Sequence, residues 1–370
     1  MNDRIFNTFK ALTAIDSPSR GERNLCDELK QRLTLLGAEL YEDRAGEQVG
    51  GDCGNLYAFI KGAGEPVLLS AHMDTVEPSR GKRAILHEDG SITSAGDTVL
   101  GADDIAGVTI ILEAITRIKE QGIPHRSVEL LFPVAEEIYC GGSKYAEYDR
   151  ITAKQAYILD LNGEIGEAAY AAPTILSFDI QITGRAAHAG FAPADGINAI
   201  AAAASAISEI KQGTRSDKAT LNIGKISGGI QGNIVPDLCE ITGEIRSLSH
   251  ENALSLWSET QKIFVHHAKA IGAEIKTDHR CTITAYETPM ESRTVLDFQK
   301  ACNAVNIKSS IHSTMGGSDN NNFALHGIEG LVIANAMRNI HSTSESTSIH
   351  DMETCVELIM EILKINHWKE

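Results

Sequence analysis

The sequence predicts an α/β protein in which a doubly wound, mainly parallel sheet is interrupted by an inserted two-layer α+β domain. Strand-like and helix-like segments alternate along the first 172 residues, which is typical of a sheet covered by helices on both faces. A block with a βαββαβ pattern occupies residues 173–284, and the helix–strand alternation resumes after it. We therefore expect a discontinuous first domain, formed by residues 1–172 and 285–370, with the second domain inserted into it.

Each predicted element has a simple basis in the sequence. Apolar residues at steps of three and four indicate amphipathic helices, whereas short runs of apolar and β-branched residues indicate strands. In the first domain the predicted elements are helices at 1–12 and 22–36, strands at 56–60 and 67–70, a helix at 105–118, strands at 128–134 and 156–161, and a last helix at 352–363. In the inserted domain they are a strand at 177–183, a helix at 197–210, strands at 220–226 and 239–246, a helix at 250–271 and a strand at 274–284.

Composition and charge exclude several classes of protein. The 370 residues include 33 Lys and Arg against 50 Asp and Glu, a net charge of −17, and no basic cluster fits a nucleic-acid backbone. The start of the sequence does not resemble a secretory signal, and no apolar run approaches the ~18 residues of a membrane-spanning helix. The 7 cysteines are scattered without a C-x-x-C pair, which suits free thiols in a reducing compartment. We expect a cytoplasmic protein with neither a nucleic-acid nor a membrane partner.

The first candidate site residues follow a strand and begin a helix. His72 and Asp74 directly follow the strand at 67–70, and Asp103 and Asp104 lie at the start of the long helix. Asp74 could fix the tautomer of His72 while the other ring nitrogen binds a metal ion, and one Asp of the pair could bridge two cations. Taken singly, each has an ordinary structural explanation as a buried histidine or as acids that cap a helix.

Further acids and a histidine follow other predicted strands. Glu136 and Glu137 come after one strand, Asp160 lies near the end of the next, and His341 follows an apolar run near the end of the chain. Because ligand sites of open α/β sheets lie outside the carboxyl ends of strands, we expect these residues to meet at one edge. Each of them alone could equally be a polar residue of a loop or turn.

The combined set predicts a hydrolytic metal centre. Carboxylates and imidazoles suit zinc, cobalt or manganese, and two such cations that share one carboxylate activate water for hydrolysis. The chain has no G-x-S-x-G elbow, which argues against a serine hydrolase. It also lacks the strand–glycine-rich loop–helix unit that would bind a nucleotide.

These stretches resemble the dinuclear-zinc peptidases and deacylases, a family that includes peptidase T, carboxypeptidase G and acetylornithine deacetylase. The matches follow the family's order across nearly the whole chain. They are Ser70–Val76, Leu100–Asp104, Ala135–Glu137, Ile158–Asp160, Ala186–Gly190 and Asn339–Ser342. The tetrahedral aminopeptidases carry similar elements but insert a domain between the first His and the Asp pair. Only 103 − 72 = 31 residues separate His72 from Asp103, which favours the peptidase T and deacylase group.

The resemblance implies a role for each residue of the set. The implied metal ligands are His72 and Asp160 for one ion, Glu137 and His341 for the other, and Asp103 as the bridge between them. Glu136 would be the general base, which takes a proton from the attacking water and passes it to the leaving amine. Asp74 would orient His72. Family members also carry a cis peptide after the bridging Asp, here between Asp103 and Asp104.

The resemblance also gives the inserted domain a function as lid and dimer interface, so we expect a homodimer. His188 would reach the partner subunit's active site and stabilise an oxyanion there. Arg246 and Asn233 would hold a substrate carboxylate, and Gly317 would lie in a segment that lets the substrate approach the backbone closely. The alternatives are a turn histidine, a solvated strand arginine and a plain glycine turn.

The segments around His72 and Asp103 look most like those of peptidase T relatives. The expected activity is therefore that of a tripeptide aminopeptidase acting on short peptides with two divalent metal ions, zinc first, with cobalt or manganese also suited. An N-acyl-amino-acid deacylase or a carboxypeptidase would use the same chemistry. A relative that binds metal without turnover is a further alternative, against which Glu136 argues.

Overall fold

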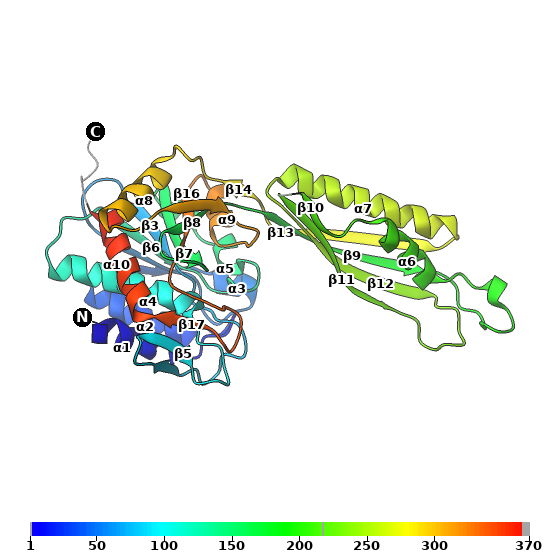
Figure 1. Ribbon diagram of the computed structural model, residues 1–370, viewed down its shortest axis with the longest axis horizontal. Helices are drawn as coiled ribbons and strands as arrows, with labels where there is room; N and C mark the ends of the chain where they lie inside the picture. The colour runs from blue at the N-terminus through cyan, green and yellow to red at the C-terminus, as the bar shows by residue number, and fades with distance from the viewer. Residues whose placement is uncertain (1, 217, 365–370) are drawn as a thin grey trace. The chain divides into compact units, whose positions relative to one another are not determined.

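The computed structural model describes residues 2–216 and 218–364, which form two compact units (Figure 1). Unit 1 takes the chain up to residue 171, residues 287–314 and the chain from residue 318 onward, and unit 2 takes residues 172–286 and 315–317. The predicted boundaries, after residues 172 and 284, lie one and two residues from these limits. The assignment of residues 315–317 to unit 2 was not expected from the sequence. The predicted start of the first helix at Met1 lies outside the described residues.

Unit 1 is built on a mainly parallel sheet. The strand order is β1-β2-β6-β3-β7-β16-β8-β14, and β15 pairs with β8. The strands are β1 (Glu39–Glu42), β2 (Leu56–Ile60), β3 (Val67–Ser70), β6 (Val128–Phe132), β7 (Gln155–Leu161), β8 (Glu167–Ala172), β14 (Tyr286–Glu287), β15 (Ser310–Ser313) and β16 (Glu329–Ala334). The neighbouring strands β6, β3, β7 and β16 are parallel to one another, so their carboxyl ends lie at one edge of the sheet.

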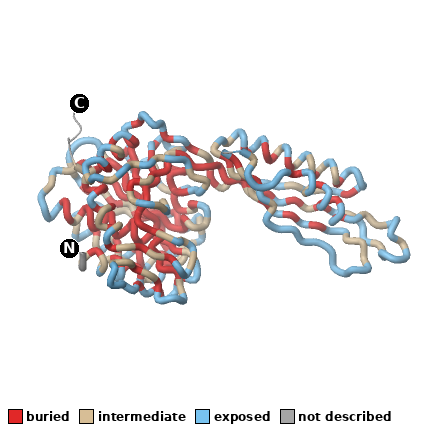
Figure 2. Tube along the Cα trace, in the orientation of Figure 1, coloured by how far each residue is buried: buried red, intermediate tan, exposed pale blue. Residues whose placement is uncertain are grey.

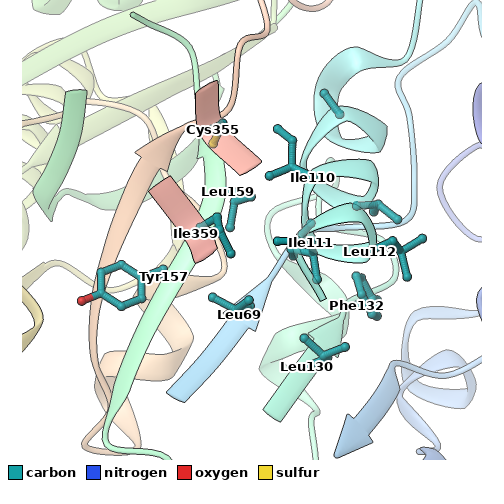
Figure 3. Packing of buried hydrophobic residues seen from close by; sticks show 14 of the residues in the cluster. Leu69, Ile110, Ile111, Leu112, Leu130, Phe132, Tyr157, Leu159, Cys355 and Ile359 are labelled. Carbon is teal, nitrogen blue, oxygen red and sulfur yellow. The ribbon is translucent and has the colours of Figure 1, made fainter. Parts of the chain in front are cut away.

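Helices cover this sheet on both faces, which explains why its central strands are mostly apolar on both sides. Along β6, Leu130 and Phe132 belong to the large core cluster, whereas Leu131 belongs to a smaller cluster on the opposite face. The helices that supply the large cluster are α1 (Asn2–Thr13), α2 (Arg23–Leu35), α4 (Ala102–Glu120), α8 (Arg293–Ala304) and α10 (Ile349–Leu363). Figure 3 shows side chains of α4 and α10 packed with those of the sheet, and Figure 2 shows this buried interior in red. The smaller cluster includes Phe323 of α9 (Asn320–Leu325).

A glycine lets α4 lie close to the sheet beside the carboxyl end of β7. A Cβ at Gly107 would lie 2.7 Å from the carbonyl oxygen of Leu159 and 2.4 Å from Oδ1 of Asp104. Any larger residue would therefore push the start of α4 away from β7. The short helices α3 (Ala45–Val49) and α5 (Gly141–Lys144) lie together elsewhere in the same unit.

A small three-stranded sheet in unit 1 ties the last part of the chain to an early segment. Its order is β17-β5-β4, formed by Ser346–Ser348, Ser91–Ser94 and Ala84–Leu86 respectively. These strands have only three or four residues, and β5 and β17 consist largely of serine and threonine, so the sequence patterns did not reveal them. The pairing of β17 with β5 fixes the chain just before α10.

Unit 2 is an antiparallel sheet covered by two helices. The strand order is β10-β11-β12-β9-β13. The elements are β9 (Thr174–Thr183), α6 (Ala199–Glu209), β10 (Gly213–Ser216), β11 (Ala219–Gly228), β12 (Leu238–Ser247), α7 (His250–Ala270) and β13 (Glu274–Ile283). Along β9 the buried Phe178, Ile180 and Ile182 alternate with more exposed polar residues, as the sequence pattern predicted. Phe178 stacks on Trp257 of α7 with ring centroids 5.1 Å apart.

Four helices begin with a side chain that accepts a hydrogen bond from their first turn. These N-cap residues are Asn198 before α6, Ser249 before α7, Ser292 before α8 and Ser348 before α10. Such caps satisfy main-chain N–H groups that have no partner within the helix. Among the described residues, every helix is too short or too polar to cross a lipid bilayer.

Candidate active site

The carboxyl edge of the parallel strands gathers the predicted site residues of unit 1. His72 follows β3, Glu136 and Glu137 follow β6, and Asp160 lies near the end of β7. His341 comes from the loop after β16, the strand next to β7. The place where these residues meet is therefore the edge at which open α/β sheets bind their ligands.

Two histidines face the two oxygens of one aspartate. Nε2 of His72 lies 3.0 Å from Oδ1 of Asp103 and 3.9 Å from Oδ1 of Asp160. Nε2 of His341 lies 3.1 Å from Oδ2 of Asp103 and 3.1 Å from Oε2 of Glu137. Ligand atoms that share a tetrahedral zinc ion are roughly 3.3 Å apart, given bonds of about 2.0–2.1 Å. The three separations of 3.0 and 3.1 Å are close to that spacing, the one to Asp160 is longer, and Asp103 stands where a bridging carboxylate would.

Charge and burial also fit metal ions. Two groups of described side chains that include His72 have ligand atoms within 4.8 Å of one another: His72 with Asp103 and Glu137, and His72 with Glu136 and Asp160. Burial, together with the charge of Asp160, raises the pKa of Glu136, and burial with the charge of Asp103 raises that of Asp160. Oε1 of Glu137 is buried without a hydrogen-bond partner. Divalent cations would offset this repulsion and satisfy the unpaired oxygen.

The site is open to solvent on one side. The side chain of His341 is 50% exposed, whereas that of His72 is 1% exposed. Hydrogen bonds with Asp103 and Glu137 raise the pKa of His341 to about 10. A substrate could therefore approach from the side of His341 without any rearrangement of the buried ligands.

Asp74 connects three segments of the site. Its Oδ1 accepts a hydrogen bond from the main-chain N–H of Glu136 at 2.9 Å, and its Oδ2 accepts from that of Glu137 at 3.2 Å and from the hydroxyl of Ser19 at 2.6 Å. Nδ1 of His72 lies 2.9 Å from the carbonyl oxygen of Asp74 and 3.4 Å from its carboxylate. Asp74 thus positions Glu136 and Glu137 as well as His72. The sequence pattern suggested only its role toward His72.

Asp104 is a second buried connection. The peptide between Asp103 and Asp104 is cis, as the family resemblance implied. Oδ2 of Asp104 accepts from the main-chain N–H of His72 at 3.1 Å, and its Oδ1 accepts from Nδ2 of Asn335 at 2.5 Å. Asn335 also donates to the carbonyl oxygen of Leu159, next to Asp160, at 2.6 Å. Sequence reasoning missed Asn335, whose one signal is its place directly after an apolar strand.

Glu136 has two further neighbours, Cys140 and Asp319, whose contact with it was not predicted from the sequence. The thiol of Cys140 donates to Oε1 of Glu136 at 3.1 Å, and a carboxylate oxygen of Asp319 lies within 4.8 Å of ligand atoms of both. Cys140 and Asp319 are buried. Glu136 is thus held among buried, partly anionic neighbours, which together with burial raise the pKa of its carboxyl group.

In unit 2 the structure brings His188 and Asn233 together. The main-chain N–H of Ala189 donates to the carbonyl oxygen of Asn233 at 2.9 Å, and both residues are exposed. Nδ1 of His188 accepts from the main-chain N–H groups of Gly190 and Phe191 at 3.1 and 3.2 Å. In the neutral ring the proton is therefore on Nε2, which can donate to an oxyanion.

Arg246 contacts the short segment of unit 2 that contains Gly317. The guanidinium of Arg246 donates to Oε1 of Glu244 at 2.7 Å and to the carbonyl oxygen of Met315 at 2.8 Å. Gly317 lies two residues after Met315 and is exposed. Because Arg246 is already paired with Glu244 on the same strand, a substrate carboxylate would have to share the guanidinium group with Glu244.

Solved structures decide the family. The chain matches the crystal structure of aminopeptidase PepT from Bacillus cereus with a TM-score of 0.94 and 34% identity, over 98% of both chains. The chain is a peptidase T-like metallopeptidase of the M20 family. A tripeptidase from Staphylococcus aureus matches this peptidase T-like chain with a TM-score of 0.96 and 30% identity, over 99% of this chain and 98% of that one.

Sequence comparisons agree with the structural ones. Peptidase T of Haemophilus influenzae is 27% identical over 284 residues, which span 74% of this peptidase T-like chain and 66% of that protein. The family model described as a peptidase dimerisation domain matches residues 170–271, most of unit 2. The model of peptidase family M28 matches residues 55–212. Residues 55–212 include His72, the pair Asp103 and Asp104, and the pair Glu136 and Glu137.

Proposed function

We propose that this chain is a metal-dependent aminopeptidase that removes the first residue of tripeptides. One observation carries the proposal: Asp103 turns one carboxylate oxygen to His72 and the other to His341, with Asp160 and Glu137 beside them. The similarity to aminopeptidase PepT and to a tripeptidase over nearly the whole chain supports the substrate class.

The proposed metal centre holds two divalent cations. His72 and Asp160 would hold one, Glu137 and His341 the other, and Asp103 both. Zinc is the metal that we propose, although cobalt and manganese accept the same ligands. When bound, the two cations supply Lewis acidity, which polarises the scissile carbonyl and lowers the pKa of water.

The other groups of unit 1 would move the proton. Glu136 would take a proton from the attacking water and deliver it to the nitrogen of the leaving dipeptide. Its burial favours the protonated state between these two transfers, because a charged carboxylate is poorly solvated there. Asp74 would keep Glu136 and Glu137 in place through their main-chain N–H groups.

Unit 2 would bind the substrate and a second copy of the chain. We propose a homodimer in which His188 donates from Nε2 to the oxyanion in the partner's active site. Arg246, Asn233 and the backbone at Gly317 would hold the carboxyl end of the peptide. Exposed apolar side chains on unit 2, including Ile226 and Ile230, support an interface on this domain.

The cell compartment that we propose is the cytoplasm. All seven cysteines are free, and six of them are buried. Free thiols are usual where the surroundings are reducing. Neither a nucleic acid nor a membrane is needed as a partner.

A peptide panel tests the function. Zinc-loaded protein would be incubated with di-, tri- and tetrapeptides, each with a free and an acetylated amino terminus, and the products identified by mass spectrometry. Release of the first residue from free tripeptides alone is the expected result. Release of acetyl groups or of carboxyl-terminal residues would establish a deacylase or carboxypeptidase instead.

A variant of the base tests the mechanism. Glu136→Gln should bind the same number of zinc ions as wild type, because Glu136 is not a proposed ligand, and should lower kcat by ~10²–10⁴-fold. The matched control is Glu129→Gln, which alters a buried glutamate near the start of β6, the strand that precedes Glu136. Wild-type turnover in Glu136→Gln would remove Glu136 as the base.

A further inference from the structure

A buried carboxylate outside the proposed ligand set joins two segments that carry ligands. Glu345 is 1% exposed and lies four residues after His341. Its Oε1 accepts a hydrogen bond from the main-chain N–H of Asp103 at 2.8 Å, and its Oε2 accepts from that of Gly101 at 2.7 Å. One side chain thus connects the loop of His341 to the segment of the bridging aspartate.

The loop that carries Glu345 is closed at its base. Arg338 and Ser346 exchange two main-chain hydrogen bonds, each 2.9 Å long, and Ser346 begins β17, which pairs with β5. Within the loop, the N–H of Glu345 donates to the carbonyl oxygen of Ser342 at 3.1 Å. His341 has a φ of +59°, a conformation that a non-glycine residue keeps only where its surroundings enforce it.

The segment that receives Glu345 needs an acceptor. The N-cap of α4 is Gly101, which has no side chain to cap the helix, and Asp103 has non-helical dihedral angles (φ −83°, ψ 99°). The N–H groups of a helix start have no partner within the helix, and a negative charge is favoured there. Glu345 supplies both acceptor oxygens from a distant part of the chain.

We propose that Glu345 is a positioning residue that sets the separation between His341 and Asp103, and so determines how tightly the cation between them is bound. The inference rests on the proposed metal centre. Neither oxygen of Glu345 needs to touch the metal: both are used by main-chain N–H groups. A glutamine at this position has one acceptor oxygen and one NH₂ group, so at least one of the two N–H groups would lose its partner.

Zinc titration tests this proposal against a matched control. Metal-free wild type, Glu345→Gln, Glu345→Ala and Glu129→Gln would each be titrated with Zn²⁺ in competition with a chromophoric chelator. Glu129 is also 1% exposed and also accepts from two main-chain N–H groups, those of Thr152 and Ala153 at 3.0 Å each. Its hydrogen bonds join the start of β6 to residues just before β7, at the opposite ends of these strands from the proposed ligands.

We expect Glu345→Gln to bind one of its two zinc equivalents ~10–100-fold less tightly, and Glu345→Ala to bind it more weakly still, while Glu129→Gln titrates as wild type. Hydrogen exchange in the metal-free proteins gives a local readout. The N–H groups of Gly101 and Asp103 should exchange faster in both Glu345 variants and at the wild-type rate in Glu129→Gln.

Three results would overturn the inference. Wild-type zinc affinities in both Glu345 variants would make Glu345 a residue of the fold only. An equal loss of zinc affinity in Glu129→Gln would assign the effect to general destabilisation. A wild-type protein that takes up fewer than two zinc equivalents would overturn the proposed metal centre itself, and the inference with it.

Discussion

Replacing Asp74 by asparagine tests whether one carboxylate supports the site. Asp74 is fully buried and accepts three hydrogen bonds, from the main-chain N–H groups of Glu136 and Glu137 and from the hydroxyl of Ser19. Asparagine keeps the shape but replaces one acceptor oxygen by an NH₂ group. The hydroxyl of Ser19 can rotate and accept from that group, whereas a main-chain N–H cannot.

The cost follows from these contacts. In either orientation of the amide, the N–H of Glu136 or of Glu137 faces another donor, and a buried unpaired N–H costs about 1–3 kcal/mol. The remaining bonds lose the strength that the negative charge gave them, which adds ~1 kcal/mol. The expected loss is ~3 kcal/mol. In a folding unit of about 250 residues this corresponds to a fall in Tm of roughly 6–12 °C.

Thermal unfolding of the metal-free protein measures this loss apart from any loss of metal. The control is Asp89→Asn, because Asp89 accepts from the main-chain N–H and the hydroxyl of Ser91 in the same way, but on an exposed turn. The control should unfold at the wild-type temperature. If Asp74→Asn did so too, the main-chain positions of Glu136 and Glu137 would not depend on Asp74, and the reasoning would be refuted.

Three further variants test other parts of the molecule. Burial lowers the pKa of Lys82 to about 8 from 10.5, so between these pH values the unfolded chain binds more protons than the folded one. Lys82 should therefore contribute up to ~3 kcal/mol to a rise of the unfolding free energy with pH in this window. Urea titrations at each pH should show it as a difference between wild type and Lys82→Met that grows with pH, because the opposite slope expected from His341 is the same in both proteins. Gly243→Ala should destabilise unit 2 by ~1–3 kcal/mol in thermal unfolding, because a Cβ there would lie 2.2 Å from Cζ of Phe178. His188→Ala should lower kcat by ~10²–10³-fold, and hybrids with Glu136→Ala subunits should regain part of the activity, measured on tripeptides after joint refolding.

Each of these predictions has its own control. An equal rise of stability with pH in Lys82→Met would assign the slope to other groups. Gly224→Ala is the control for Gly243, because a Cβ at Gly224 would meet only the amide nitrogen of Asn222, at 3.4 Å, and an equal loss in both would contradict the packing argument. The control for the hybrids is His188→Ala refolded alone. If the hybrids with Glu136→Ala were no more active on tripeptides than this control, the result would argue against an active site shared between subunits.

The sequence predicted the fold class well because the elements that define it are long or mostly apolar. The strands β3, β6 and β7 are mostly apolar, with only one or two polar residues each, and the family resemblance extended to the order of the domains. Short strands such as β4, β5 and β17 escaped prediction because three or four residues are too few to give a periodic signal. The place of β16 between β7 and β8 also cannot be read from chain order, since the partner of a parallel strand is set by packing.

The candidate site was predictable to the extent that its side chains face the proposed metals. Carboxylates and histidines at strand ends are recognisable because their chemistry requires those residue types. Asn335 and Glu345 were missed because they act on main-chain groups, and any polar loop residue looks the same in a sequence. The contact of Arg246 with Met315, which takes residues 315–317 into unit 2, depends on one side chain reaching a carbonyl oxygen 69 residues away.

The position of β16 has a consequence for synthesis of the chain. Residues 329–334 form an inner strand of the unit 1 sheet, between β7 and β8, which are both made before unit 2. As the chain emerges from the ribosome, β7 keeps an open edge until these late residues arrive, and such edges pair readily with other chains. The proposed ligand His341 follows only afterwards. A chain that stops early therefore lacks both the inner strand and the last ligand, so peptide hydrolysis begins only once synthesis of unit 1 is nearly complete.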